Sequence, residues 1–336
     1  MKKIKIAQIG TSMNSHGQNI FESIKKQKEI FDVVGYALPE NENEKFPERM
    51  KIFEGYSQMT IEEILNNSEI EAVTVETEEK YLTKYAQMAA DSGKHIHMEK
   101  PGGICLQDFE KLIETVKKNK TVFHTGYMYR YNPFVIELME KIKNGELGEI
   151  LSVEAQMNCI HTENVREWLK DFPGGIMFFL GCHLVDLLLQ IQGKPEHIIP
   201  LNKSTGTNNI QTQDFGFAVF EYKKGVSFAK VNAVEYGGFA RRQLVVTGTK
   251  ATVELKPFEM TADESNGSIL YTGRTTYKSN VWGDRGEYEH SANFDRYNNM
   301  MESFAKMVRG EIVNPYTYDY ELELYKTILE ACGGKR

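Results

Sequence analysis

The amino-acid sequence predicts an α/β protein: a doubly wound parallel sheet, followed by an α+β domain with a large, mostly antiparallel open sheet. Up to about residue 126, short apolar runs alternate with segments of helical periodicity, which is typical of parallel strands joined by crossover helices. Beyond that point, β-rich runs follow one another with few helices between them. The 336 residues suffice for about two domains. We therefore expect one domain over 1–126 and a second over 127–336, whose last helix could pack against the first.

The first domain is expected to alternate strand and helix from its start. Its first run, Ile4 to Ile9, is apolar and rich in isoleucine, and a glycine with polar residues separates it from the first helical spacing. Gly93 is a C-terminal stop signal for the helix before it. The expected strands are 4–9, 32–38, 70–75, 95–98 and 121–126, and the expected helices are 20–30, 61–65, 81–92 and 108–118.

The second domain is expected to be dominated by antiparallel strands. Glycine-containing turns such as Lys224-Gly225 and Gly248-Thr249 separate its β-rich runs, as they do in hairpins. The expected strands are 150–159, 215–222, 226–234, 243–247 and 252–255, and the expected helices are 175–190, 295–308 and 318–329.

Composition excludes several classes of protein. With 41% hydrophobic and 26% charged residues the chain is too apolar to be disordered, and its net charge of −7 includes no dense basic patch for nucleic acid. The four cysteines are scattered without a Cys-x-x-Cys pair, so neither a disulfide framework nor a cysteine zinc site is expected. No export signal and no apolar run of about 20 residues is found, so we expect a cytoplasmic protein without a membrane partner.

The segment Gly10 to Gly17 lies where a dinucleotide-binding fold holds a pyrophosphate, between the first strand and the first helix. The usual Gly-x-Gly-x-x-Gly pattern is absent. Backbone N–H groups at a helix N-terminus can still bind phosphate, so Gly10, Thr11, Ser12 and Asn14 are candidate cofactor-binding residues. The alternative is an ordinary strand-to-helix turn.

The end of the second strand bears on the form of the cofactor. Leu38 occupies the position where an acidic residue usually binds the adenosine ribose, and Glu40 lies two residues further. No arginine follows closely in the sequence to bind a 2′-phosphate. NAD is therefore expected, with NADP as the alternative.

The segment Gly93-Lys94-His95-Ile96-His97-Met98-Glu99-Lys100-Pro101 resembles the Gly-Lys-His-x-x-x-Glu-Lys-Pro signature of the glucose-fructose oxidoreductase, inositol dehydrogenase and rhizopine-catabolism (Gfo/Idh/MocA) family. Further segments similar to the family follow in order, at 125–133, 145–150, Trp168 and Gly174-Gly175. The resemblance implies a Rossmann-type first domain and a cis Lys100-Pro101 bond. It also implies that Lys100 is catalytic and that Thr77, Glu99, Lys100 and Pro101 lie at the cofactor. A solvated surface lysine is the alternative for Lys100.

The helix expected over 175–190 carries Phe179, His183, Asp186 and Gln190 along one side. His183 matches the histidine that the family uses as a general base or substrate ligand, and imidazole titrates near neutral pH. The alternative is a core histidine bonded to Asp186. Catalytic family members carry an aspartate four residues before this histidine, where this chain has Phe179, so activity is either altered or lost unless another group substitutes.

Several further residues are candidate ligands of a sugar or polyol. Charged groups can hold hydroxyls and aromatic faces can contact C–H surfaces, so the candidates near the helix are Tyr127, Arg130, His161, Trp168 and Asp186. Ordinary packing is the alternative for each. His95 and His97 point to one face of their strand, but no third ligand follows at a suitable spacing, and no metal site is expected.

We therefore expect an NAD(P)-dependent oxidoreductase that transfers a hydride between nicotinamide and a sugar, polyol or related hydroxylated molecule, with Lys100 and His183 as catalytic residues. The alternatives are a cofactor- or sugar-binding sensor that has lost the reaction, and an NAD-dependent glycoside hydrolase. By resemblance, the large sheet is expected to pair in a homodimer or homotetramer.

Overall fold

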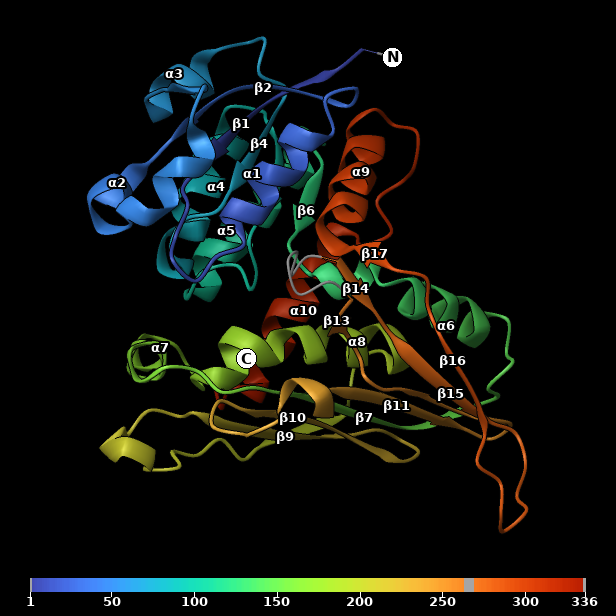
Figure 1. Ribbon diagram of the computed structural model, residues 1–336. Helices are drawn as coiled ribbons and strands as arrows, with labels where there is room; N and C mark the ends of the chain where they lie inside the picture. The colour runs from blue at the N-terminus through green and yellow to red at the C-terminus, as the bar shows by residue number, and fades with distance from the viewer. Residues whose placement is uncertain (1, 263–268, 335–336) are drawn as a thin grey trace. The chain divides into compact units, whose positions relative to one another are not determined.

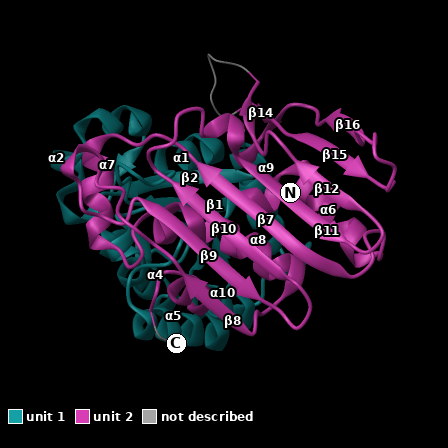
Figure 2. Cartoon of the chain, turned by 90° about the horizontal axis from the view of Figure 1, so that it is seen from below, with its two compact units in different colours: residues 1–128, 297–325 teal, residues 129–296, 326–336 magenta. Residues whose placement is uncertain are grey.

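The computed structural model describes residues 2–262 and 269–334 (Figure 1). The chain forms two compact units, coloured separately in Figure 2. The first comprises Met1–Met128 and Tyr297–Tyr325, and the second comprises Tyr129–Arg296 and Lys326–Arg336. In the described ranges, no helix has both the length and the apolar character needed to cross a membrane.

A six-stranded sheet forms the centre of the first unit, in the order β3-β2-β1-β4-β5-β6. Every neighbouring pair is parallel, and the chain reverses its direction of winding between β1 and β4, so the predicted doubly wound sheet is confirmed. All four residues of β4 are buried, as a strand covered on both faces requires. The strands are β1 Ile4–Ile9, β2 Phe31–Ala37, β3 Ser57–Gln58, β4 Ala72–Val75, β5 His95–Met98 and β6 Phe123–Thr125.

Helices from both ends of the chain cover this sheet. Those of the N-terminal part are α1 Gly17–Lys26, α2 Glu42–Lys45, α3 Ile61–Asn66, α4 Leu82–Asp91 and α5 Leu106–Asn119. Two later helices join them, α9 Arg296–Val308 and α10 Tyr318–Ala331. The Ser23 hydroxyl of α1 donates to the Asn298 side chain of α9 at 2.8 Å, and Tyr325 of α10 stacks on Phe109 of α5 with ring centroids 4.3 Å apart. These contacts explain why Tyr297–Tyr325 belongs to the first unit.

The second unit is built on an eight-stranded sheet in the order β16-β15-β12-β11-β7-β10-β9-β8. Only the β7–β10 pair is parallel among these neighbours, so the predicted mostly antiparallel sheet is confirmed. Figures 1 and 2 show helices against one face of this sheet and none of this unit's helices against the other. The strands are β7 Ile150–Asn158, β8 His197–Pro200, β9 Phe215–Glu221, β10 Val226–Asn232, β11 Gln243–Gly248, β12 Thr252–Leu255, β15 Gly273–Tyr277 and β16 Glu287–His290. A small sheet joins β13 Met260–Thr261, β14 Ile269–Tyr271 and β17 Phe294–Asp295.

The second unit contains helices that the sequence did not predict. Helix α6, Pro133–Lys143, begins at Asn132, whose side chain accepts hydrogen bonds from two backbone N–H groups of the first turn. Helix α7, Glu163–Trp168, is one short segment between β7 and the predicted helix. The segment expected as one helix over 175–190 starts as a π-helix, Met177–Gly181, and continues as α8, Cys182–Gln192.

Candidate functional site

The turn between β1 and α1 begins at a position that only glycine can occupy. Gly10 has a φ of +88°, and a Cβ atom there would lie 2.6 Å from Cγ2 and 2.7 Å from the backbone nitrogen of Thr77. The backbone N–H of Ser12 donates to the carbonyl of Glu76 at 2.9 Å. The turn is therefore held closely against the residues that follow β4, which is where a doubly wound sheet binds its ligand.

Two serines follow Gly10 at the spacing that the second and third glycines of a dinucleotide turn usually have. The Ser15 hydroxyl donates to the carbonyl of Ser12 at 3.0 Å and accepts the N–H of Gly17 at 3.1 Å. The N–H of Asn14 donates to the Ser12 hydroxyl at 3.4 Å. The side chains of this turn thus form hydrogen bonds that glycines could not form, and the turn keeps a compact shape without the usual motif.

A buried carboxyl group, rather than Leu38 or Glu40, reaches the turn from the end of β2. Glu42 is fully buried and accepts the N–H of Thr11 at 2.8 Å. Burial raises the pKa of Glu42 to about 8, although the Thr11 hydrogen bond opposes this shift. Glu40 instead accepts hydrogen bonds from Lys84 and Tyr85, both at 2.7 Å. Leu38 is half-buried and directly precedes a 3-10 turn at 39–41.

An arginine reaches the turn, although none follows Leu38 closely in the sequence. Arg49 donates to the carbonyl of Met13 and, at 3.4 Å, to the carbonyl of Ser15. It belongs to the 3-10 segment Pro47–Phe53, which the sequence did not predict. Arg49 is eleven residues beyond Leu38 in the sequence, so its contact with the turn becomes evident only in the folded chain.

Glu99 connects the turn to Lys100. One oxygen of Glu99 accepts from both the backbone N–H and Nδ1 of His16, each at 2.7 Å, and the other accepts the N–H of Lys100 at 2.8 Å. Burial opposes the ionisation of Glu99, but His16 and Lys100 together lower the pKa of Glu99 to about 2. The bond between Lys100 and Pro101 is cis, as the resemblance implied.

Lys100 is itself buried, so it is not the solvated surface lysine that was the alternative. Burial raises the pKa of Glu79 to about 8 and raises that of Glu76, and in both cases the positive charge of Lys100 works in the opposite direction. Lys100 thus supplies positive charge to a group of buried carboxyls that includes those of Glu76, Glu79 and Glu99. Glu42, Glu76 and Glu79 were not predicted as site residues, because isolated glutamates after strands belong to no recognisable motif.

Of the two histidines of β5, His97 lies in the core of the first unit and His95 is half-buried. The Nδ1 atoms of His97 and His124 are 2.7 Å apart, and burial lowers the pKa of His97 to about 4. His95 accepts the N–H of Val122 at 2.9 Å. Over residues 2–262 and 269–334, the structure contains no group of three or more His, Cys, Asp or Glu residues that could hold a metal ion.

In the second unit, His183 lies buried on α8 beside Tyr129. The two rings meet edge to face, with centroids 5.0 Å apart. One turn further, Asp186 accepts from Nε of Arg130 at 3.0 Å, from Nη2 of Arg130 at 2.8 Å, and from the Gln190 amide at 2.8 Å. Arg130 and Asp186 therefore form a buried ion pair that joins α8, the helix that carries His183, to the segment before α6.

Phe179 joins two of the predicted substrate residues in one aromatic cluster. Its ring meets Trp168 edge to face at 5.0 Å and lies 6.1 Å from the ring of His161. Trp168 in turn contacts Phe172 at 4.5 Å. His161 also lines a cavity of about 280 Å³, together with Thr162, Glu163, Arg166 and Tyr236 among others.

The structure distributes the predicted site residues over the two units. Gly10, Thr11, Ser12, Asn14, Leu38, Thr77, Glu99, Lys100, Pro101 and the buried Tyr127 belong to the first. Arg130, His161, Trp168, His183 and Asp186 belong to the second. Within the first unit the turn, Thr77, Glu99 and Lys100 come together, and within the second the ion pair and the aromatic cluster occupy α8 and the segments before it.

A parallel sheet with a glycine turn where its winding reverses is the arrangement found in dinucleotide-binding proteins, and comparison with known proteins agrees with this class. Residues 4–127 match the model of an oxidoreductase family with an NAD-binding Rossmann fold, and residues 135–254 match the GFO/IDH/MocA C-terminal domain. The chain belongs to the Gfo/Idh/MocA family of oxidoreductases. The predicted resemblance and the predicted NAD-binding Rossmann domain are confirmed.

Individual relatives are distant. An uncharacterized oxidoreductase of Rhizobium meliloti, ORF334, is 23% identical over 82% of this chain and 80% of its own length. The glucose-6-phosphate 3-dehydrogenase of Bacillus subtilis is 28% identical over 56% of this chain and 53% of its own length. The structure of a levoglucosan dehydrogenase in complex with NADH and levoglucosan has a TM-score of 0.76 at 15% identity, over 99% of this chain and 98% of that one. This likeness shows a shared fold.

Proposed function

We propose that the protein is an NAD(P)-dependent dehydrogenase that acts on a CH–OH group of a sugar, a polyol or a related hydroxylated molecule. The observation that carries the proposal is the position of Lys100. It is a buried cation after β5, and Glu99 links its backbone to the turn that a dinucleotide would occupy. The sugar and polyol dehydrogenases among the relatives support the substrate class.

The residues present fit a dinucleotide. Gly10 lets the turn lie close against Thr77, and Arg49 places a guanidinium at the turn, where it donates to the carbonyls of Met13 and Ser15. Gly10, Thr11, Ser12 and Asn14 would lie at the pyrophosphate, with Thr77, Glu99 and Pro101 beside it. The backbone N–H groups of Gly10, Thr11 and Ser12 already donate within the protein, so they are not counted as phosphate donors. Leu38 would contact the adenosine. When bound, the nicotinamide exchanges a hydride with the substrate carbon.

The proposal assigns the proton transfer to the chain's own residues. In the oxidation, the hydride leaves the carbinol carbon, the O–H proton passes to a ring nitrogen of His183, and a C=O bond forms. Lys100 would donate a hydrogen bond to the substrate oxygen and stabilise the negative charge that develops there. His161, Trp168 and Tyr127 would contact the substrate. The ion pair of Arg130 with Asp186 would hold α8 in position.

A sensor is an alternative because Phe179 replaces the family's usual aspartate and the turn lacks the usual glycine pattern, and an NAD-dependent glycoside hydrolase is a further alternative. A sensor would bind the cofactor or a sugar without turnover. A glycoside hydrolase would cleave its substrate without net reduction of NAD. Both are distinguished from a dehydrogenase by the same measurement, the net formation of reduced nicotinamide.

The test combines a substrate panel with variants. Purified protein is incubated with NAD or NADP and a panel of sugars and polyols, and reduced nicotinamide is measured by its absorbance. Lys100→Ala and His183→Ala are each expected to lower kcat by at least about a hundredfold with the verified substrate. Lys118→Ala, which changes an exposed lysine of α5, should leave it unchanged. Unchanged turnover in Lys100→Ala would refute the assigned role, and substrate cleavage without net reduction would favour the hydrolase.

We also propose that the open face of the eight-stranded sheet pairs copies of the chain. Alternate residues of β9 and β10 point away from the buried face, among them Phe217 and Phe228, whose rings stack at 5.4 Å. Ile199 of β8 is 42% exposed on the strand beside β9. Phe228→Lys should convert an oligomer into monomers in light-scattering measurements. A parent protein that is already monomeric would contradict this.

A further inference from the structure

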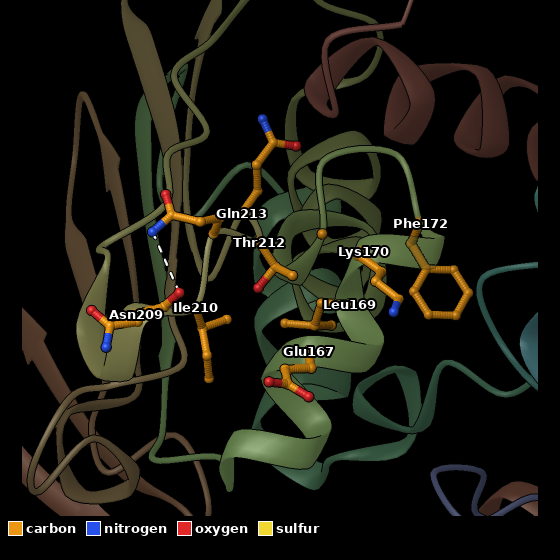
Figure 3. Close-up of a pocket in the computed structure, with 10 residues that line it drawn as sticks. Glu167, Leu169, Lys170, Phe172, Asn209, Ile210, Thr212 and Gln213 are labelled. Atoms are coloured by element: carbon orange, nitrogen blue, oxygen red, sulfur yellow. Dashed lines mark hydrogen bonds between the residues drawn. The ribbon is translucent and has the colours of Figure 1, made fainter.

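The second unit contains a cavity that the proposed reaction does not use. Its volume is about 580 Å³, within the range of small-molecule sites, and Figure 3 shows the side chains around it. The residues that line it come from 167–175 and from 209–213. It shares no lining residue with the smaller cavity at His161.

A buried ion pair fixes the wall of this cavity. Nη1 of Arg166 lies 3.1 Å from Oδ2 of Asp214, and both side chains are almost fully buried. The Thr212 hydroxyl donates to the carbonyl of Arg166 at 2.6 Å. Arg166 also donates to the carbonyl of Thr207 and to the side chain of Asn208. These contacts hold the segment 207–214 against α7, so the cavity is formed before any ligand arrives.

The cavity also borders the start of the segment that leads to His183. The N–H of Ile176 donates to the carbonyl of Gln213 at 2.9 Å. Gly175 has a φ of +52°, and a Cβ there would lie 2.3 Å from the same carbonyl oxygen. Only glycine permits this close approach, so the segment and the helix meet at a fixed point.

The groups around the cavity have the chemistry that hydroxyl groups require. Three residues with side-chain amides line it, and an amide carries both donors and an acceptor. The Gln211 amide uses one donor on the carbonyl of Asn209, and the Thr212 hydroxyl, which donates to Arg166, can still accept. Glu167 and Lys170 contribute one charge of each sign, so neither an anion nor a cation is favoured. Leu169 and Ile210 extend into the same space from opposite sides and form a buried apolar floor (Figure 3).

We propose that this cavity is a second binding site, for a neutral polyhydroxylated molecule such as a sugar or a polyol. Its hydroxyls exchange hydrogen bonds with the amides of Asn209, Gln211 and Gln213, while its C–H surface lies on Leu169 and Ile210. The site is separate from the proposed reaction, because it includes neither Lys100 nor His183, and it stands even if the chain transfers no hydride.

Saturation-transfer NMR on the full chain without added cofactor tests the proposal. The probes are D-glucose, myo-inositol and cellobiose, with D-glucose 6-phosphate and D-glucosamine as charged comparisons. We expect saturation transfer to at least one neutral probe and weaker transfer to both charged ones. Absence of transfer to every neutral probe overturns the proposal, as does tighter binding of the phosphate.

Variants locate the binding. Lys170 and Gln213 are exposed side chains, so Lys170→Met with Gln213→Met should leave the fold intact and weaken the neutral probe by about tenfold. Lys223→Met, a matched exposed lysine on the same unit, should leave the affinity unchanged. If the double variant still binds the neutral probe but His183→Ala does not, the probe binds at the proposed reaction site. That result would overturn the second site and support the proposed function.

Discussion

Arg130 and Asp186 form a two-point ion pair inside the second unit, with Nε and Nη2 of Arg130 3.0 and 2.8 Å from the carboxylate oxygens of Asp186. The two residues are 56 positions apart, and both side chains are almost fully buried. Asp186 lies three residues beyond His183 on α8, whereas Arg130 precedes α6. The pair therefore fixes the helix that carries His183 to a different part of the unit.

Breaking this pair should destabilise the protein strongly. Asp186→Asn leaves the Arg130 guanidinium buried without its counter-charge, so we expect a loss of about 3 kcal/mol in the free energy of unfolding. Urea denaturation followed by circular dichroism measures it. Asp171→Asn, at an exposed aspartate of the same unit, should change the stability by less than about 0.5 kcal/mol. Equal effects of the two substitutions would show that the ion pair contributes nothing specific.

Substitutions at Gly10 and at Gly55 separate the effect of backbone strain from the effect of a steric clash. Gly10 and Gly55 have φ values of +88° and +86°, but a Cβ meets Thr77 at Gly10 and nothing within 4 Å at Gly55. Gly55→Ala should therefore cost about 1 kcal/mol of stability and leave NADH affinity unchanged. Gly10→Ala should displace the turn and weaken NADH binding by at least about tenfold. Titration of protein fluorescence with NADH provides the affinities, and equal affinities in the two variants would contradict the role of Gly10.

Glu42 should make the stability of the protein dependent on pH. Its pKa is about 8 in the folded protein, against 4.5 for an ordinary glutamate, because the side chain is buried. Between these values the folded protein retains a proton that the unfolded chain has lost. Stability should thus fall as the pH rises from about 5 through about 8.

Glu42→Gln cannot ionise, so this variant should lose less stability than the parent across the same pH range. Glu44→Gln, an exposed glutamate of the same helix, serves as the control and should follow the parent. Glu79 also has a pKa of about 8 and leaves a residual slope in every variant. Urea denaturation at several pH values provides the comparison, and parallel profiles for Glu42→Gln and the parent would refute the assignment.

Local patterns sufficed for most of the fold. Strand β4 lacks charged residues because both of its faces are buried, and β4 and β5 were predicted to within two residues at each end. Helix α6 was not predicted, although an asparagine before a proline is a helix start signal. The π-helix before α8 has no distinguishing period in the sequence.

The candidate site was predictable only where a motif marks it. Lys100 was predicted from the family signature and His183 from its match to the family's histidine. Glu42 follows the 3-10 segment Pro39–Asn41 and Arg49 lies within the 3-10 segment Pro47–Phe53, and neither has a motif. The partnership of Arg130 with Asp186 depends on two elements that meet only in the folded chain. Sequence distance contains no information on such contacts, so these residues become candidates only once the fold is known.

Substitution of Phe179 tests whether this position can accept the aspartate that is usual in the family. Its ring is 8% exposed and packs between Trp168 and His161, so a carboxylate there would lose hydration without a prepared partner. Phe179→Asp is therefore expected to lose about 3 kcal/mol of stability at neutral pH, and less at acidic pH, where the carboxyl takes up a proton. Phe179→Leu, which keeps the site apolar, should show a loss that does not vary with pH. If Phe179→Asp is as stable as the parent at neutral pH, the aromatic cluster does not exclude a charge. The missing aspartate would then reflect the substrate rather than the packing.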